Sequence, residues 1–170
     1  DAALAPPTLR TAQGRLMIDC RIVNAFSPDL RTLATSGTEI LLYLFVDVHQ
    51  EGERKAIVST VSENRLWYDA VRGTYLIARI PSGDTVRTTI VDSALSAAST
   101  YRNLTIATAD RLPKTGRYRF VIQAVLGKAE IDALKNSTVD LMYFWRFRRP
   151  LVATEAYAYQ ELFPDRSAMQ

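Results

Sequence analysis

Strict alternation of apolar and polar residues is the feature that most limits what this chain can fold into. In GRLMIDCRIVN, residues 14–24, every second residue from Leu16 to Ile22 is apolar. A β-strand directs successive side chains to opposite faces, so this period of two predicts a strand with one buried face. RYRFVIQAVLG, residues 117–127, repeats the pattern with aromatic and aliphatic residues. Both segments are therefore predicted to be strands of antiparallel sheets.

Turn and cap residues divide the chain between such strands. Ser27 is a good N-cap, Pro28 suits the first helical position, and Gly37 can end a short helix in a left-handed conformation. TEILLYLFVDVHQ, residues 38–50, is followed by a polar turn and is predicted to be a central strand. DAVRG, residues 69–73, is predicted to be a hairpin connection.

Two further helices are predicted from local spacing. DSALSAASTYRN, residues 92–103, has apolar residues at helical intervals, with Asp92 or Ser93 as the N-cap. KAEIDALKNS, residues 128–137, suits a helical turn or two. The last stretch, residues 151–170, has the composition of a helix but a tyrosine spacing that suits a strand.

These elements predict a mainly β protein, an antiparallel β-sandwich or flattened barrel with two or three short connecting helices. The chain has 170 residues, of which 48% are apolar and 23% charged, and these values suit one folded domain. We expect an extended N-terminal arm over residues 1–12, a single domain over 13–150, and a C-terminal extension of uncertain structure over 151–170.

LMYFWRFRRP, residues 141–150, is the stretch that most resembles a binding site. As a strand it would place Leu141, Tyr143, Trp145 and Phe147 on one buried face, with its arginines at one exposed end. Those arginines, joined by two from the strand that begins near residue 117 if the strands pair, would form an arginine-rich rim that binds a partner. The rim residues are Arg146, Arg148, Arg149, Arg117 and Arg119.

Other partners are less well indicated by the same stretch. Arginines and aromatics that alternate along a strand project from opposite faces, whereas nucleic-acid stacking platforms need both on one face. A membrane-surface helix would show a basic helical face, which the segment lacks. The net charge of +3 is too small to name nucleic acid as a partner, and the longest apolar run, residues 40–46, is too short to cross a bilayer.

The residues that catalysis or metal binding would require are sparse. His49 is the only histidine, and Asp47 shares its strand face, but a surface histidine is the favoured interpretation because a catalytic histidine also needs a nucleophile. One histidine and one cysteine, Cys20, make a zinc site improbable, and no EF-hand loop or glycine-rich phosphate loop occurs. We therefore predict no catalytic residue, no cofactor and no metal, although carboxylates brought together by the fold stay possible.

Three stretches resemble one known family. They are GRLMIDCRIVNAFSPDLRTLATSGTEILLYLFVDV at residues 14–48, LWYDAVRGTYLIAR at 66–79 and GRYRFVIQAVL at 116–126. Together they are similar to a family of exported bacterial proteins known as domain of unknown function 4390. The resemblance covers roughly residues 13–150 and implies a β-rich fold in the periplasm or cell envelope. It transfers no catalytic residue. The first residue is Asp1, so a removed signal peptide and a trimmed chain are both open.

Two functions follow as the main hypotheses, and an enzyme of unfamiliar type, with carboxylates clustered in a cleft, is the third. The first is a non-enzymatic envelope protein that acts as a protein-interaction or scaffold module, through a sheet edge or the arginine-rich rim, with another envelope protein as its partner. The alternative is a carrier that holds a small apolar ligand between its sheets.

Overall fold

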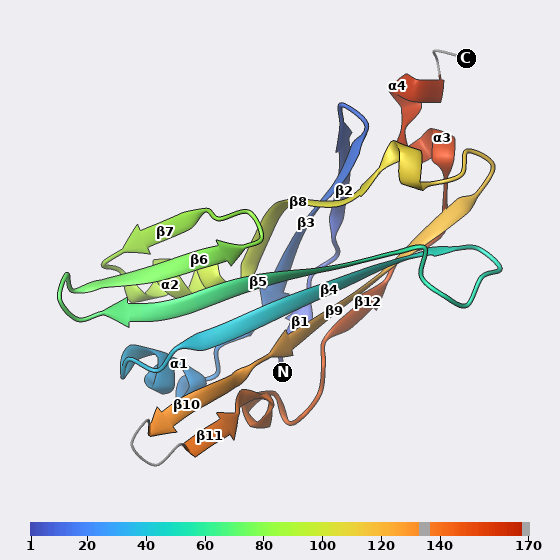
Figure 1. Cartoon of the computed structure of the whole chain (residues 1–170). Coiled ribbons are helices and arrows are strands. Elements are labelled where there is room, and N and C mark those ends of the chain that lie inside the picture. The colour runs from blue at the N-terminus through green and yellow to red at the C-terminus, as the bar shows by residue number, and fades with distance from the viewer. Residues whose placement is uncertain (133–136, 168–170) are drawn as a thin grey trace.

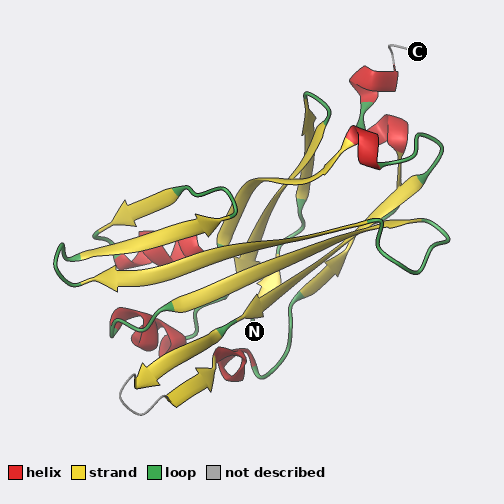
Figure 2. Cartoon of the chain, in the orientation of Figure 1, coloured by secondary structure: helices red, strands yellow, loops and turns green. Residues whose placement is uncertain are grey.

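The computed structural model describes residues 1–132 and 137–167, and it is a mainly β protein with short helices (Figures 1 and 2). The larger antiparallel sheet contains, in spatial order, β12 (Leu151–Ala153), β9 (Arg117–Leu126), β4 (Ile40–Gln50), β5 (Val58–Asp69), β6 (Thr74–Ile80) and β7 (Thr85–Thr88). β13 (Tyr157–Ala158) also pairs with β9. The predicted fold class is confirmed.

A smaller sheet is built around β3. It contains β1 (Ala3–Leu4), β2 (Thr8–Ala12), β3 (Arg15–Val23) and β8 (Thr100–Thr108). β2 and β8 pair with the same part of β3, so they lie on its opposite sides. Residues 1–12, expected as an arm, are indeed extended, but they contribute two paired strands to this sheet.

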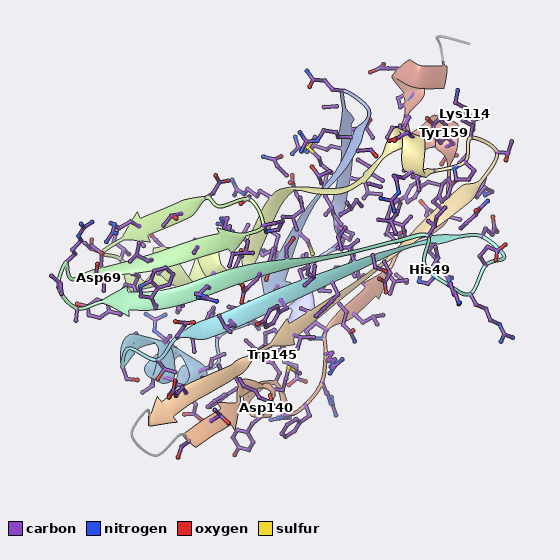
Figure 3. All side chains as sticks on the ribbon, in the orientation of Figure 1. His49, Asp69, Lys114, Asp140, Trp145 and Tyr159 are labelled. Carbon is purple, nitrogen blue, oxygen red and sulfur yellow. The ribbon has the colours of Figure 1, made fainter. Side chains whose placement is uncertain are left out.

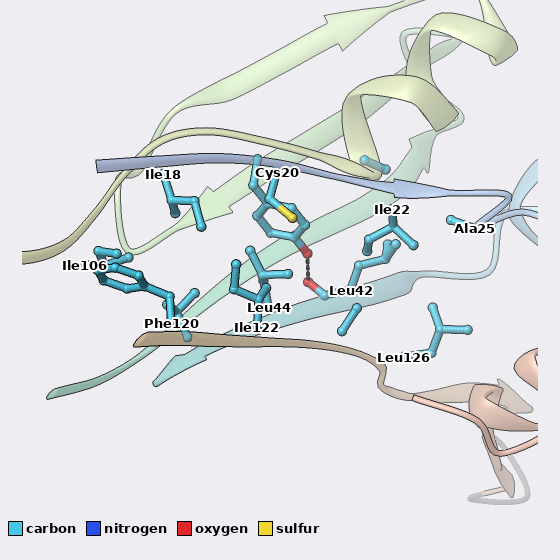
Figure 4. Packing of buried hydrophobic residues seen from close by; sticks show 14 of the residues in the cluster. Ile18, Cys20, Ile22, Ala25, Leu42, Leu44, Ile106, Phe120, Ile122 and Leu126 are labelled. Carbon is cyan, nitrogen blue, oxygen red and sulfur yellow. Dashed lines mark hydrogen bonds between the residues drawn. The ribbon is translucent and has the colours of Figure 1, made fainter. Parts of the chain in front are cut away.

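The two sheets face each other and enclose one core (Figure 4). β3 contributes Leu16, Ile18, Cys20 and Ile22, the residues that its alternation predicted. β4 and β9 contribute their own alternate side chains from the opposite sheet. Those side chains are Ile40, Leu42, Leu44, Val46 and Val48 of β4, and Tyr118, Phe120, Ile122, Ala124 and Leu126 of β9. The flattened barrel thus has two seams, one where β8 approaches β5 and one where β1 approaches β12.

The central strand and the first helix form as predicted. β4 pairs with β5 on one side and with β9 on the other. α1 (Pro28–Thr35) begins after Ser27, whose hydroxyl oxygen accepts a hydrogen bond from the Leu30 N–H at 3.3 Å. Gly37 follows the helix with φ +101°, the left-handed conformation that favours glycine.

The hairpin between β5 and β6 is also confirmed. The Gly73 N–H donates to the Asp69 carbonyl at 2.8 Å. The Asp69 carboxylate accepts from the Val71 and Arg72 N–H groups, and this bonding lowers the pKa of Asp69.

The second helix begins earlier than predicted. α2 (Val91–Ala98) has Ile90 at its N-cap position, which supplies no side-chain cap, so Asp92 and Ser93 lie inside the first turn. Asp92 instead forms an ion pair with Arg31 of α1 at 2.6 Å. An acidic residue in the first turn still complements the helix dipole, which explains why the local pattern resembled a cap.

The predicted helix over residues 128–137 is wrong where the structure describes it. Residues Lys128–Asp132 form β10, which pairs with β11 (Ser137–Asp140), and residues 133–136 lie outside the described part. Ala129 is buried against the core. KAEID alternates with a period of two as well as suiting a helix, so tertiary pairing decided its structure.

The C-terminal extension contains both strand and helix. β12 and β13 pair with β9, and α3 (Tyr159–Leu162) and α4 (Pro164–Ser167) follow. Tyr159, Leu162 and Phe163 are buried. Residues 151–163 therefore complete the larger sheet and its core.

Replacing Tyr101 by Phe tests a hydrogen bond that crosses the core. The Tyr101 hydroxyl, in a side chain only 1% exposed, donates to the Leu42 carbonyl at 2.7 Å (Figure 4). We expect Tyr101→Phe to lower the free energy of unfolding by about 1 kcal/mol, since a buried bond is lost. Tyr143→Phe removes an exposed hydroxyl and should change nothing. Equal denaturant midpoints for the two variants would contradict this reading.

The Cys20 thiol gives stability a specific pH dependence. Burial raises its pKa from 9.0 to about 11. The folded state therefore holds this proton more tightly than the unfolded state, so the contribution is complete below pH 9.0 and lost as pH rises toward 11. Denaturant unfolding of wild type and Cys20→Ala across this range should show a steeper loss in wild type. Parallel curves would show that the thiol does not contribute.

Candidate functional site

The aromatic and arginine-rich stretch is not a strand. Residues Leu141–Trp145 form a 3₁₀ helix, η2, and the next two residues, Arg146 and Phe147, have left-handed φ values of 55° and 56°. The Asp140 carboxylate begins this turn by accepting from the Met142 N–H at 3.0 Å. The Phe147 N–H then donates to the Met142 carbonyl at 2.8 Å. Period alone cannot assign so short an apolar run, and the Asp140 cap favoured the turn.

The turn divides the aromatic residues differently from the predicted strand face. Leu141 and Trp145 are buried as expected, but Tyr143 is 66% exposed and Phe147 is 64% exposed. Met142, which a strand would place on the opposite face from these four, is buried, and its sulfur accepts from the Leu126 N–H at 3.2 Å. The prediction that all four alternate aromatic and aliphatic residues enter the core is therefore wrong for two of them.

Trp145 fixes this turn to the rest of the molecule. Its indole N–H donates to the Ala25 carbonyl, just before α1, at 2.8 Å in a buried setting. Figure 3 labels Trp145 and Asp140 at the end of the molecule that holds β10 and β11. We call residues 143–149 the aromatic knuckle. Its base is formed by the buried Met142 and Trp145, and its exposed side chains include Tyr143 and Phe147.

The five predicted rim arginines fall into two separate groups. Arg146, Arg148 and Arg149 are exposed on the aromatic knuckle. The chain then enters β12, and just before this strand the Pro150 carbonyl accepts from the Ala124 N–H at 2.9 Å.

Arg117 and Arg119 lie at the beginning of β9. Arg119 is five residues from Ala124, about 17 Å along the strand. Arg117 forms an ion pair with Glu51 at 3.2 Å and donates to the Ala156 carbonyl. The structure therefore brings the three late arginines together and leaves the other two beside the β4–β5 turn.

His49 is half-buried beside that same turn, where Figure 3 labels it. It is the cross-strand neighbour of Arg119 in a hollow of about 300 Å³ that also contains Glu51, Glu53 and Glu155. Within residues 1–132 and 137–167, no group of three or more His, Cys, Asp or Glu residues could hold a metal ion.

Large side chains occupy the space between the sheets. Tyr101, Phe120 and Ile122 are fully buried there (Figure 4). An apolar ligand between the sheets would have to displace such residues. The carrier hypothesis stays a prediction, and no observation in the interior favours it.

The seam between β5 and β8 is the feature that the sequence did not reveal. β6 pairs with β5 only from Glu63 onward, so among the described strands residues 58–62 of β5 have a partner, β4, on one side only. β8 likewise has β3 as its described partner on one side. Two backbone edges with unpaired N–H and C=O groups therefore face this seam.

Side chains hold the seam closed at one end. The Asn64 amide donates to the Ala98 and Thr100 carbonyls at 2.9 and 3.0 Å. The Arg79 guanidinium donates to the same Thr100 carbonyl at 2.7 Å. Burial lowers the pKa of Arg79, which still makes these bonds as a donor.

Beyond this tie the two strands separate. The pairing of β8 with β3 shifts register twice, and Asn103, which lies at one of these shifts, has φ 55°, so β8 carries bulges that increase its twist. A hollow of about 300 Å³ opens between the strands, and we call it the β5–β8 groove. It is lined by Ile57, Val58, Ser59, Thr60, Thr105, Ile106, Ala107, Thr108 and Arg111.

The lining of the β5–β8 groove suits a peptide backbone. Its side chains are hydroxyl-bearing or apolar, with Arg111 as the one charged residue in the lining. The two segments that face it, IVSTVS at 57–62 and LTIATA at 104–109, carry no charge. That uncharged, β-branched composition was the available sequence signal, but recognising it required knowing where β6 leaves β5.

The structure thus belongs to the class of antiparallel two-sheet proteins, with a seam that leaves two strand edges open. The family model described as Domain of unknown function (DUF4390) matches residues 1–134, and the chain belongs to this family. The family resemblance seen in the sequence is confirmed, although the match starts and ends earlier than expected. The aromatic knuckle lies beyond it.

No match was found among curated proteins or among solved structures. In the part of the chain that the structure describes, no helix is long and apolar enough to cross a membrane.

Trp145→Leu tests whether the aromatic knuckle depends on its buried base. We expect a loss of roughly 2–4 kcal/mol in the free energy of unfolding, because both buried volume and the bond to the Ala25 carbonyl are lost. Trp67→Leu, at a half-buried position of β5, is the matched control and should lose less. If Trp145→Leu lowers the free energy of unfolding less than Trp67→Leu does, the buried Trp145 side chain is not what holds the turn in place.

Proposed function

We propose that this chain is a non-enzymatic protein-interaction module of the cell envelope, which binds an extended segment of another protein in the β5–β8 groove. One observation carries the proposal: two unpaired strand edges without charged residues face each other across a hollow. A peptide strand placed there would bond to an edge through its main chain. Its alternate side chains would reach the groove and provide specificity.

The composition of these strand edges suits pairing with a partner strand, because the edges lack the residues that normally prevent such pairing. Free strand edges in soluble proteins usually carry lysine or proline, or are covered. Residues 57–62 contain neither, nor any other charged residue. The bulges of β8 twist the strand, which hinders direct pairing with β5 and leaves room for an inserted strand.

The remaining parts of the proposal have other support. The envelope location rests on what the family resemblance implied about export. The non-enzymatic character rests on the scattered distribution of the titratable residues and on the single histidine. The partner class, an extended protein segment, rests on the groove alone.

A photo-crosslinking amino acid at Thr60, which lines the groove, tests the proposal. Irradiation in envelope extracts should attach one protein through an extended segment, which mass spectrometry of the cross-linked peptide identifies. The matched control carries the same amino acid at Val71, in the exposed β5–β6 turn. Equal capture from Val71, or none from Thr60, would count against the groove.

Thr60→Lys should then weaken binding of a synthetic copy of that segment by about tenfold or more, because a charge on the edge opposes strand addition. Thr88→Lys on β7 introduces the same charge on another edge and should bind normally. Isothermal titration gives both affinities, and unfolding curves show whether each variant is folded. Unchanged affinity of folded Thr60→Lys would contradict the proposal.

A further inference from the structure

We propose that the aromatic knuckle, residues 143–149, docks the protein on the surface of an anionic lipid bilayer. This inference is independent of the β5–β8 groove, since it concerns a different surface. It rests on three features of the knuckle: exposed aromatic side chains, a concentration of arginines, and a strained backbone on a rigid base.

The exposed aromatic residues have no role in the core. Tyr143 is 66% exposed and packs edge-on against Phe144, with 5.5 Å between the ring centroids. Phe147 is 64% exposed. Amphipathic aromatic rings gather at the interface between lipid and water, where one part of the ring is apolar and another is hydrated.

The knuckle carries three arginines and no acidic residue. Arg146, Arg148 and Arg149 are exposed. Arg146 forms one long ion pair, with the exposed Asp1 carboxylate at 3.9 Å. The nearby Asp140 carboxylate is engaged in capping η2. Guanidinium groups bind phosphate oxygens in a bidentate manner, so three of them beside aromatic rings match an anionic headgroup layer.

The backbone conformation is unfavourable for the residues present. Two consecutive residues other than glycine, Arg146 and Phe147, have φ near +55°. Such conformations are sterically unfavourable and persist only where the surroundings impose them, often at functional sites. The buried Trp145 and Met142 anchor this turn through their hydrogen bonds to Ala25 and Leu126, and Phe147 lies exposed on it.

The shape of the knuckle favours a lipid surface over a protein partner. Protein hot spots place aromatic residues where a rim of neighbours excludes water. Tyr143, Phe147 and the three arginines stand on the outside of a tight turn, and the hollows described above are lined by other residues. A convex tip of this composition suits a fluid surface that adapts to it. Docking of this kind does not require an amphipathic helix.

Sedimentation with vesicles tests the proposal on the full chain. We expect binding to vesicles of phosphatidylcholine and phosphatidylglycerol in equal parts, little binding to pure phosphatidylcholine, and weakening as salt is raised. The double variant Arg148→Gln with Arg149→Gln should lower the partition coefficient by about tenfold or more. The matched control, Arg54→Gln with Lys55→Gln in the exposed β4–β5 turn, loses the same charge and should bind nearly as wild type.

Phe147 separates docking from folding. Phe147→Gly should weaken vesicle binding while leaving the denaturant midpoint equal or higher, because glycine adopts the left-handed conformation without strain. Phe147→Trp should bind more tightly, since Trp favours the interface. A folded Phe147→Gly variant that binds as wild type would overturn the aromatic part of the proposal.

Two results would overturn the proposal as a whole. One is binding that does not distinguish anionic from neutral vesicles, or that falls equally in the Arg54 and Lys55 control. The other is that the wild-type protein does not bind vesicles, while the Arg148 and Arg149 double variant no longer binds a protein that the wild type binds. That result would show that the knuckle contacts a protein and not a bilayer. Thr60→Lys should bind vesicles normally, so failure at the groove and failure at the knuckle can be told apart.

Discussion

The double pairing of β4 is the constraint on which the rest of the structure depends. Its residues are in register with β5 on one side and with β9 on the other. A slip of one residue on either side would exchange the buried Leu42, Leu44 and Val46 with the outward Tyr43, Phe45 and Asp47. That exchange would bury the Asp47 carboxylate in the core. The observed register, which satisfies the backbone hydrogen bonds on both sides, is therefore also the one that buries the apolar side chains.

Both candidate surfaces take their positions from this register. Val58, at the beginning of the β5–β8 groove, pairs with Val48, and Leu126, which bonds to the base of η2, pairs with Leu42. Six residues of one strand, about 20 Å, separate the two points. A molecule resting on a bilayer through its knuckle would hold the groove away from the lipid and open to another protein.

Local signals were sufficient for much of the fold. The strands at residues 15–23 and 117–126 alternate over their whole length, and Ser27, Pro28 and Gly37 bound a helix by cap chemistry that acts within one turn. The signals failed where tertiary contacts decide. Residues 128–132 suit helix and strand alike, and residues 141–147 contain apolar side chains that a strand or a tight turn could bury.

The candidate sites were harder to anticipate than the fold. The three late arginines are exposed and adjacent as expected, but Arg117 and Arg119 are distant because β12, and not the aromatic stretch, pairs with β9. The β5–β8 groove depends on where β6 leaves β5 and on bulges in β8. Neither is a property of any one segment, so no periodicity could have indicated it.

The residues that follow the family match are needed for a stable fold, so they should be kept in any shortened form of this chain. The match ends at residue 134, yet β12 and β13 cover an edge of β9, and Trp145 closes one end of the core. A protein that ends at residue 134 would expose the unpaired edge of β9 and the part of the hydrophobic core that Trp145 covers. Both features promote aggregation. Fragments for expression should therefore extend at least through Phe163, whose ring is buried against Tyr159.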